Sequence, residues 1–159
     1  MKNYSNTLWI LSVSLSLAAC SFAPRGGGEA SAKPASGEVL SLSKADFLVK
    51  VFNYEQHPEA WRYAGDKPCI IDFYADWCAP CRKVSPILGE LALRYRDDLL
   101  VYKVDVDAET ELASVFGIRS IPSLLFVPVE GEPRMAGGAL SFREIEEQIN
   151  GFLLKEPAP

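Results

Sequence analysis

The sequence is poor in side chains that bind metal ions. Among its 159 residues are four cysteines and a single histidine. A structural zinc centre needs four ligands, which usually come in two closely spaced pairs. Only Cys78 and Cys81 have that spacing. The remaining candidates, Cys20, Cys69 and His57, are isolated from one another in the sequence. The number and spacing of these residues therefore argue against a bound metal, and we expect no cofactor.

The chain also lacks an excess of basic residues. Sixteen Lys and Arg stand against 21 Asp and Glu, which gives a formal net charge of −5, and no Lys/Arg cluster stands out. A protein without a basic patch has little with which to neutralise the phosphates of a nucleic acid. We therefore expect no nucleic-acid partner, and proteins are the favoured partners.

No apolar run is long enough for a permanent transmembrane helix. The longest, from Leu8 to Ala19, has about a dozen residues, where about 20 are needed. Lys2 precedes it and Cys20 follows it directly. This order resembles a bacterial lipoprotein signal, in which cleavage leaves a lipid-modified cysteine at the new N-terminus. We predict a signal peptide at 1–19 and a lipid anchor on Cys20, which would hold the protein in the periplasm. The sequence does not indicate which bacterial membrane carries the lipid. A plain secretory signal and an uncleaved anchor are the alternatives.

The rest of the chain divides into a tether and one domain. Residues 20–37 contain Gly26-Gly27-Gly28, Pro24 and Pro34 without apolar periodicity, which is typical of a flexible linker. Residues 38–155 are long enough for one domain, and 48% hydrophobic content suffices for its core. We expect this domain to be monomeric.

Strand and helix patterns alternate along that domain. The nearly continuous apolar run Cys69–Tyr74 is typical of a strand covered on both faces. Ser43 and Ser141 each precede an acidic residue by three positions, a pattern that begins a helix. The predicted order βαβαβαββα implies an α/β fold with a central mixed sheet and helices on both faces. The segment Glu55–Ala64 fits no element, and we assign it no role.

The pentapeptide Trp77-Cys78-Ala79-Pro80-Cys81 lies between that apolar run and a helical pattern. At a helix start, unpaired N–H groups and the positive end of the helix dipole stabilise a thiolate on the first cysteine. The second cysteine follows one turn later, close enough to form a disulfide. The spacing favours a redox dithiol over half a zinc site or a pair of structural thiols.

Two other residues of the apolar strand bear on this chemistry. Asp72 is a carboxylate in an otherwise apolar run, where burial would raise its pKa; an edge or solvent-facing position is the alternative. Cys69 lies at the other end of the strand from the pentapeptide, so a bond to Cys78 or Cys81 is geometrically unfavourable. We interpret Cys69 as a small buried apolar residue.

Several separated motifs follow one another between residue 67 and about residue 154. They are Asp72-Phe73-Tyr74-Ala75-Asp76-Trp77-Cys78-Ala79-Pro80-Cys81, Pro86, Lys103-Val104-Asp105-Val106-Asp107, Gly117-Ile118-Arg119-Ser120-Ile121-Pro122 and Gly138-Ala139-Leu140. In this order they resemble the thioredoxin family. The chain departs from the usual pattern in the Ala79-Pro80 spacer, where Gly-Pro is typical, and in Tyr74, where many members have Trp. With the signal, the resemblance is to extracytoplasmic lipoprotein thioredoxins of Gram-negative bacteria.

The resemblance implies a thioredoxin fold and a role for each residue of the dithiol site. Cys78 would be the exposed nucleophile, and Cys81, lying deeper, would resolve the mixed disulfide. Asp72 would accept a proton from Cys81 beneath the dithiol, with Lys103 supporting it from the next strand.

The resemblance also implies a substrate groove. Pro122 would follow a cis peptide bond that places the Ile121 backbone beside the cysteines. Trp77, Gly138 and Ala139 would complete a shallow apolar surface that reads main chain more than side chains.

The function that follows is reduction of protein disulfides outside the cytoplasm. Its partners would be disulfide-containing or thiol proteins and a transmembrane electron donor. The absence of His or Lys between the cysteines favours a reductant. Two alternatives stay open: an oxidant or isomerase in protein folding, and a tethered adaptor or metallochaperone.

Overall fold

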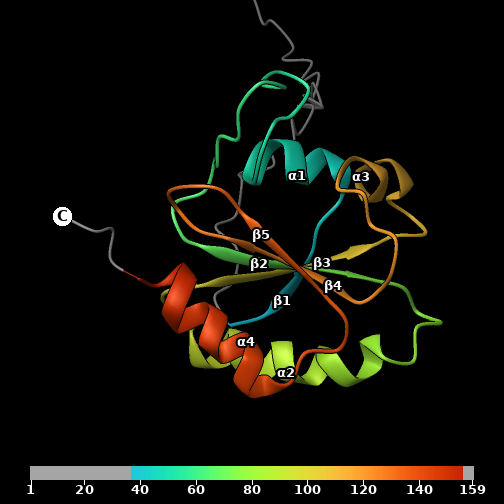
Figure 1. The fold of residues 1–159 in the computed structure, drawn as a ribbon, viewed down its shortest axis with the longest axis vertical. Helices are drawn as coiled ribbons and strands as arrows, with labels where there is room; N and C mark the ends of the chain where they lie inside the picture. Colours follow the sequence, from blue (N-terminus) through green and yellow to red (C-terminus); the bar gives the residue numbers. More distant parts are fainter. Residues whose placement is uncertain (1–36, 156–159) are drawn as a thin grey trace, which may run out of the picture. The chain divides into compact units, whose positions relative to one another are not determined.

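A five-stranded mixed sheet forms the centre of the computed structural model, which describes residues 37–155 (Figure 1). The strand order is β1-β3-β2-β4-β5; the first three are mutually parallel, and β4 and β5 are antiparallel to their neighbours. The predicted fold class is confirmed. The strands are β1 (Val39–Ser41), β2 (Cys69–Tyr74), β3 (Leu100–Asp105), β4 (Ser123–Val127) and β5 (Arg134–Gly137).

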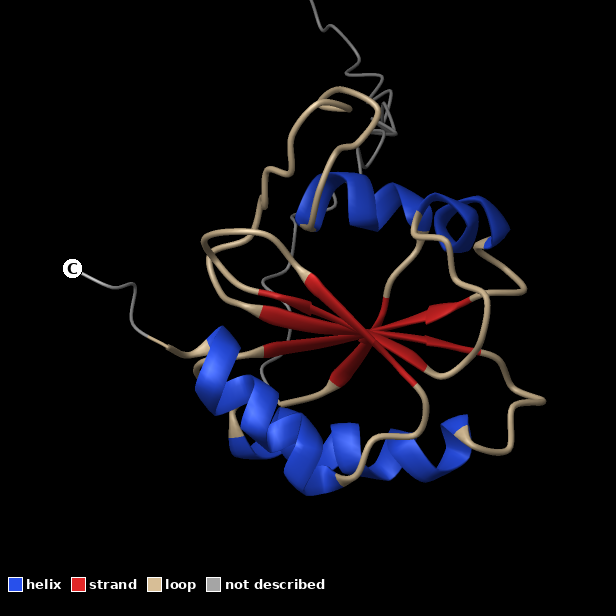
Figure 2. Ribbon diagram, viewed as in Figure 1, coloured by secondary structure: helices blue, strands red, loops and turns tan. Residues whose placement is uncertain are grey.

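Helices cover both faces of this sheet (Figure 2). One face carries α1 (Lys44–Lys50) and α3 (Thr110–Val115). The other carries α2 (Cys81–Arg94), α4 (Phe142–Gln148) and the π-helical turn η1 (Ile149–Leu153) that continues α4. Among residues 37–155, no helix is long and apolar enough to cross a bilayer.

The alternation of side chains along β2 divides the core into two clusters. Ile71 and Phe73 pack on the side of α1 and α3, whereas Ile70 packs on the side of α2 and α4. All three are fully buried. β2 is thus covered on both faces, as its apolar sequence predicts, and it fixes where α2 begins relative to the sheet.

Both predicted helix caps are present. Ser43 Oγ accepts the Asp46 N–H at 3.1 Å before α1. Before α4, the Glu144 carboxylate accepts the Ser141 N–H at 2.7 Å while Ser141 Oγ accepts the Glu144 N–H, which completes a capping box.

The unassigned segment Glu55–Ala64 extends the core beside α1. Trp61 packs on Phe52 with ring centroids 4.5 Å apart. Lys44 forms ion pairs with Glu55 at 2.8 Å and with Glu111 at 2.7 Å, which link the segment to α1 and α3. The segment therefore has a structural role that periodicity alone does not reveal, because its aromatic residues follow no regular spacing.

Some element boundaries differ from the sequence prediction. The apolar residues from Leu124 to Val129 predict a strand over that range, but β4 ends at Val127, since Pro128 has no N–H to donate to the sheet. The sequence also predicts a short helix from about Ala108, whereas α3 begins at Thr110. The predicted signal peptide, the lipidated Cys20 and the tether up to residue 36 lie outside the described residues.

Candidate active site

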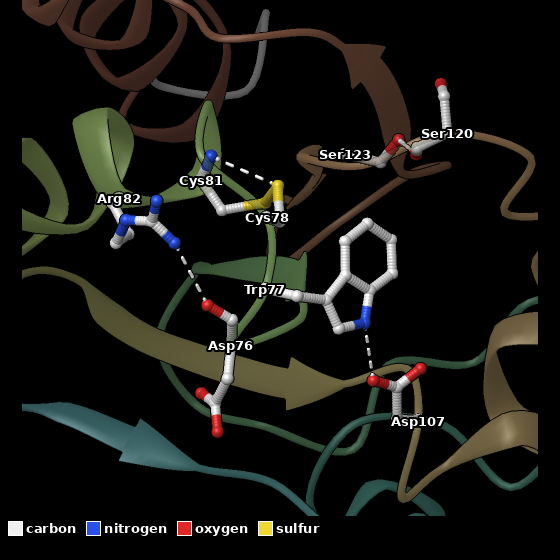
Figure 3. The surroundings of a disulfide bond; sticks show 8 residues. All are labelled: Asp76, Trp77, Cys78, Cys81, Arg82, Asp107, Ser120 and Ser123. Carbon is white, nitrogen blue, oxygen red and sulfur yellow. Dashed lines mark hydrogen bonds between the residues drawn. A yellow bond between two sulfur atoms is a disulfide. The ribbon is translucent and has the colours of Figure 1, made fainter.

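The two cysteines of the pentapeptide are joined where β2 leads into α2 (Figure 3). The Cys78 and Cys81 sulfurs are 2.04 Å apart, and the Cα atoms are 5.3 Å apart. Because β2 is buried and α2 begins at Cys81 itself, both sulfurs are held at one end of the sheet.

The start of α2 supplies a donor for the Cys78 sulfur. The Cys81 N–H donates to Cys78 Sγ at 3.2 Å, as Figure 3 shows. The first turn of the helix contains no acidic side chain that would oppose a negative charge there. A free N–H at a helix start, together with the helix dipole, favours the thiolate over the thiol.

The two cysteines do not differ in exposure as the family resemblance predicts. Cys78 and Cys81 are each only 2% exposed, so the expected exposed sulfur on Cys78 is wrong for this disulfide-linked form. The bond directs Cys78 Sγ toward the helix start, and Tyr74, Val106 and Ile121 pack against the pair.

Trp77 is an exposed aromatic residue of the site, with 68% of its surface accessible. Its indole N–H donates to Asp107 Oδ2 at 2.8 Å, which fixes the orientation of the ring beside the disulfide (Figure 3). Trp77 and Ile121 line a groove of about 320 Å³ together with Ile118 and Arg119. The groove reaches α3, where Ala113 lines it.

The loop before β4 forms another wall of the site. The Ile121–Pro122 peptide bond is cis, as predicted. The Gly138 N–H donates to the Pro122 carbonyl at 2.9 Å, so the end of β5 lies against this loop. Gly138 and Ala139 are exposed there, although neither lines the groove beside Trp77. Gly138 has φ of +96°, a conformation that side chains disfavour.

Asp72 lies on the face of β2 that α2 covers. It is 2% exposed, and its Oδ1 has no hydrogen-bond partner among the described residues. Burial raises the pKa of this carboxyl to about 7, and the charge of Lys103 opposes that rise. Lys103 is its register partner on β3. The solvent-facing alternative for Asp72 is wrong, and a neutral acid at this position can exchange a proton near neutral pH.

Cys69 lies at the other end of β2 and is fully buried, as predicted. Burial raises the pKa of its thiol to about 12, and the neighbouring Tyr63 hydroxyl partly opposes that rise. Such a thiol holds almost no thiolate at neutral pH, which makes it unreactive.

Metal coordination has no support in the described part of the chain. Within residues 37–155, no group of three or more His, Cys, Asp or Glu side chains is placed to hold an ion. The site itself contains the two linked cysteines and the buried carboxyl of Asp72.

Two features of this site have no counterpart in the sequence prediction. Asp107 anchors Trp77, although it belongs to a motif that contributed to the resemblance. Ile118 and Arg119 line the groove, and their place four and three positions before Pro122 is the signal that would have indicated them.

Comparison with known proteins agrees with the site geometry. The thioredoxin family model matches residues 45–151. The thioredoxin of Borreliella burgdorferi is 44% identical over 113 residues, which cover 71% of this chain and 96% of that protein. The thioredoxin of Haemophilus influenzae is 34% identical over 113 residues, covering 71% of this chain and 95% of that protein.

Solved structures show the same fold. A mutant thioredoxin from Halobacterium salinarum superposes with a TM-score of 0.61 at 27% identity, over 79% of this chain and 99% of that one. With the family model, the similar relatives and a disulfide at the head of α2, the chain belongs to the thioredoxin family of thiol-disulfide oxidoreductases.

Proposed function

We propose that this thioredoxin reduces protein disulfides outside the cytoplasm while anchored to a bacterial membrane through a lipid on Cys20. The observation that carries the chemical part is the Cys78–Cys81 disulfide at the head of α2, with the Cys81 N–H directed at Cys78 Sγ. The same donor would stabilise a Cys78 thiolate once the disulfide is reduced.

Reduction of a substrate would proceed in two exchanges. The Cys78 thiolate attacks one sulfur of the substrate disulfide; a Cys78–substrate bond forms, the substrate S–S bond breaks, and the leaving thiolate takes a proton from water. Deprotonated Cys81 then attacks Cys78 Sγ; the Cys78–Cys81 disulfide forms, the Cys78–substrate bond breaks, and the second substrate sulfur leaves as a thiolate that takes a proton from water. Two electrons have passed from the dithiol to the substrate.

Asp72 would accept the Cys81 proton in the second exchange, directly or through water. A pKa of about 7 leaves this carboxyl able both to take up and to release a proton near neutral pH. Lys103 would support the ionised form. The support for this role is the buried, unpartnered Oδ1 on the face of the sheet that α2 covers.

Substrates would bind across the exposed surface around the disulfide. Trp77 offers an apolar ring held by Asp107, and Ile121 packs against the cluster that contains the dithiol. Pro122, Gly138 and Ala139 would complete this surface. An extended segment could pair there through its main chain, which would give broad specificity.

The direction of electron flow is tested by equilibration with glutathione. The Ala79-Pro80 spacer carries no charge to stabilise the thiolate further, so we expect a stable disulfide and a reducing couple. Half-reduction should require a large excess of reduced over oxidised glutathione. A dithiol that is already reduced in weakly reducing buffer would instead identify an oxidant or isomerase.

Reductase activity has its own test. The wild-type protein should reduce insulin disulfides with an added electron donor, and Cys78→Ser should not. Binding of target proteins without turnover would instead favour the adaptor or metallochaperone alternative.

Anchoring and the electron donor need separate tests in cells. The wild-type protein should incorporate labelled fatty acid and sediment with membranes, whereas Cys20→Ala should do neither. Retention of label in Cys20→Ala would contradict the anchor. A transmembrane donor of electrons is required because a reductant outside the cytoplasm must be recharged; membrane proteins trapped on the Cys81→Ser variant would identify it.

A further inference from the structure

We propose that Tyr74 is a positioning residue that holds the Lys103 ammonium over its ring and away from the Asp72 carboxyl. This proposal rests on the proposed role of Asp72 as proton acceptor. It assigns to Tyr74 control over how strongly a cation stabilises the ionised acid.

The geometry places Lys103 between two competing partners. Asp72 and Lys103 are register partners on adjacent parallel strands, and Tyr74 lies two residues beyond Asp72 on the same face of β2. The Lys103 Nζ lies 5.5 Å from the centroid of the Tyr74 ring, within the range of a cation–π contact. Among the ion pairs of residues 37–155, none joins Lys103 to Asp72.

The hydration of the Lys103 ammonium explains why it lies over the Tyr74 ring and does not pair with the Asp72 carboxyl. Tyr74 and Lys103 line an open pocket of about 200 Å³, whereas Asp72 is almost fully buried. An ammonium over the ring keeps contact with water. An ammonium drawn toward Asp72 would lose much of its hydration, which offsets the gain from pairing.

The other elements around Asp72 add no competing charge to its carboxyl. β4 presents the apolar Leu124 opposite it, and α2 begins with Cys81, which does not titrate in the disulfide. Among the described residues, Lys103 on β3 is the charge that acts on the pKa of Asp72. Asp105 and Asp76 carry charge nearby, and they act on Tyr74.

The test is a carbon-13 NMR titration of the Asp72 side-chain carboxyl in the disulfide form, in which neither Cys78 nor Cys81 titrates. Tyr74→Leu should release Lys103 toward Asp72 and lower the pKa of Asp72 by roughly half a unit, the size of a surface cation–π contact. Tyr74→Phe, which keeps the ring face, and Tyr74→Trp should leave it close to the wild-type value.

A second pair of variants separates this effect from altered hydration. Lys103→Met should raise the pKa of Asp72, and adding Tyr74→Leu to Lys103→Met should cause no further fall. An unchanged or higher pKa in Tyr74→Leu would overturn the proposal. So would the same fall without Lys103, because hydration rather than the ammonium would then be its cause. If Tyr74→Leu does not fold, Tyr74→Met, which also removes the ring face, takes its place, with the same fall expected and the same results overturning the proposal.

The titration involves no turnover, so its failure is distinguishable from failure of the proposed function. If Asp72 is not the proton acceptor, Asp72→Asn will resolve mixed disulfides at the wild-type rate while the titration results stand. If only the positioning role is wrong, Asp72→Asn will slow resolution while Tyr74→Leu leaves the pKa of Asp72 unchanged.

Discussion

Cys69 is the first residue of β2, and Cys78 follows the strand in the loop that leads to α2. The two sulfurs differ in the groups that surround them. Cys69 is enclosed by the core, with a thiol pKa of about 12. Cys78 lies just before α2, where the Cys81 N–H points at its sulfur. Both residues are buried, so burial alone does not decide reactivity. The difference comes from the donor and the helix dipole at one end of the strand.

The same contrast extends to the residues beside each sulfur. At the amino end of β2, Ile70 and Ile71 are apolar and fully buried. Near the carboxyl end, Asp72 is buried with an unpartnered oxygen, which costs stability. Both ends of the strand contribute to the core, as Phe73 does near the carboxyl end, but only that end also buries a carboxyl.

The largest expected effect is the difference in thiol reactivity between the two ends. In reduced protein at pH 7, iodoacetamide should modify Cys78 at least about a thousandfold faster than Cys69, since a pKa of about 12 leaves Cys69 almost no thiolate. Peptide mapping by mass spectrometry measures both rates. Denaturant should abolish the difference, and comparable rates in the folded protein would remove the contrast.

The next effect concerns the buried carboxyl. The folded pKa of Asp72, about 7, lies above the unfolded value of about 3.9, so the folded state retains the proton between these pH values. Its contribution to stability is complete below about pH 4 and is lost as pH rises to about 8. Relative to Asp72→Asn, the wild-type free energy of unfolding should therefore fall by on the order of 3–4 kcal/mol over that window.

Urea unfolding of the disulfide form at several pH values measures this difference. The comparison with Asp72→Asn cancels groups that titrate alike in both proteins. A constant difference from about pH 4 to about pH 9 would show that Asp72 is not held protonated by burial.

A smaller effect, on stability and not on activity, is expected at Cys69. Cys69→Ser should lower the free energy of unfolding by about 1–3 kcal/mol, because it buries a hydroxyl among apolar neighbours. Insulin reduction should stay at the wild-type rate. Cys69→Ala serves as the control for lost volume, and a loss of activity in either variant would mean that Cys69 belongs to the site.

The smallest effect is expected at Asp107, which accepts the hydrogen bond from the Trp77 indole. Asp107→Ala removes the acceptor of the indole N–H and should raise the KM for a protein substrate a few-fold, with a stability change of about 1 kcal/mol or less. Asp107→Asn retains an acceptor oxygen and should behave nearly as wild type. Equal effects of both substitutions would show that the charge of Asp107 matters rather than the hydrogen bond.

The order of elements and the dithiol were predictable because local signals carry them. The apolar run of β2, the serine caps at Ser43 and Ser141 and the Cys-x-x-Cys spacing each depend on residues close in sequence. The exposure of Cys78 was not predictable in this way, because it depends on packing by Val106 and Ile121 from distant loops.

The other structural features that the sequence did not predict also depend on contacts between distant residues or on irregular spacing. The bond from Trp77 to Asp107 joins residues 30 positions apart, and the contact of Lys103 with the Tyr74 ring depends on strand register. The packing of Trp61 on Phe52 follows no periodic pattern. Sequence signals therefore indicated which residues carry the chemistry, while the structure was needed to show what holds them in place.

Trapping of substrates by variants that keep one cysteine of the Cys78–Cys81 pair tests the central claim most directly. With Cys81 changed to Ser, a substrate attacked by Cys78 cannot be released, so mixed disulfides should accumulate and mass spectrometry should locate them on Cys78. The Cys78→Ser variant, which keeps Cys81, should accumulate almost none. Mixed disulfides that form mainly on Cys81, or on Cys69 in both variants, would contradict the assignment of Cys78 as the nucleophile.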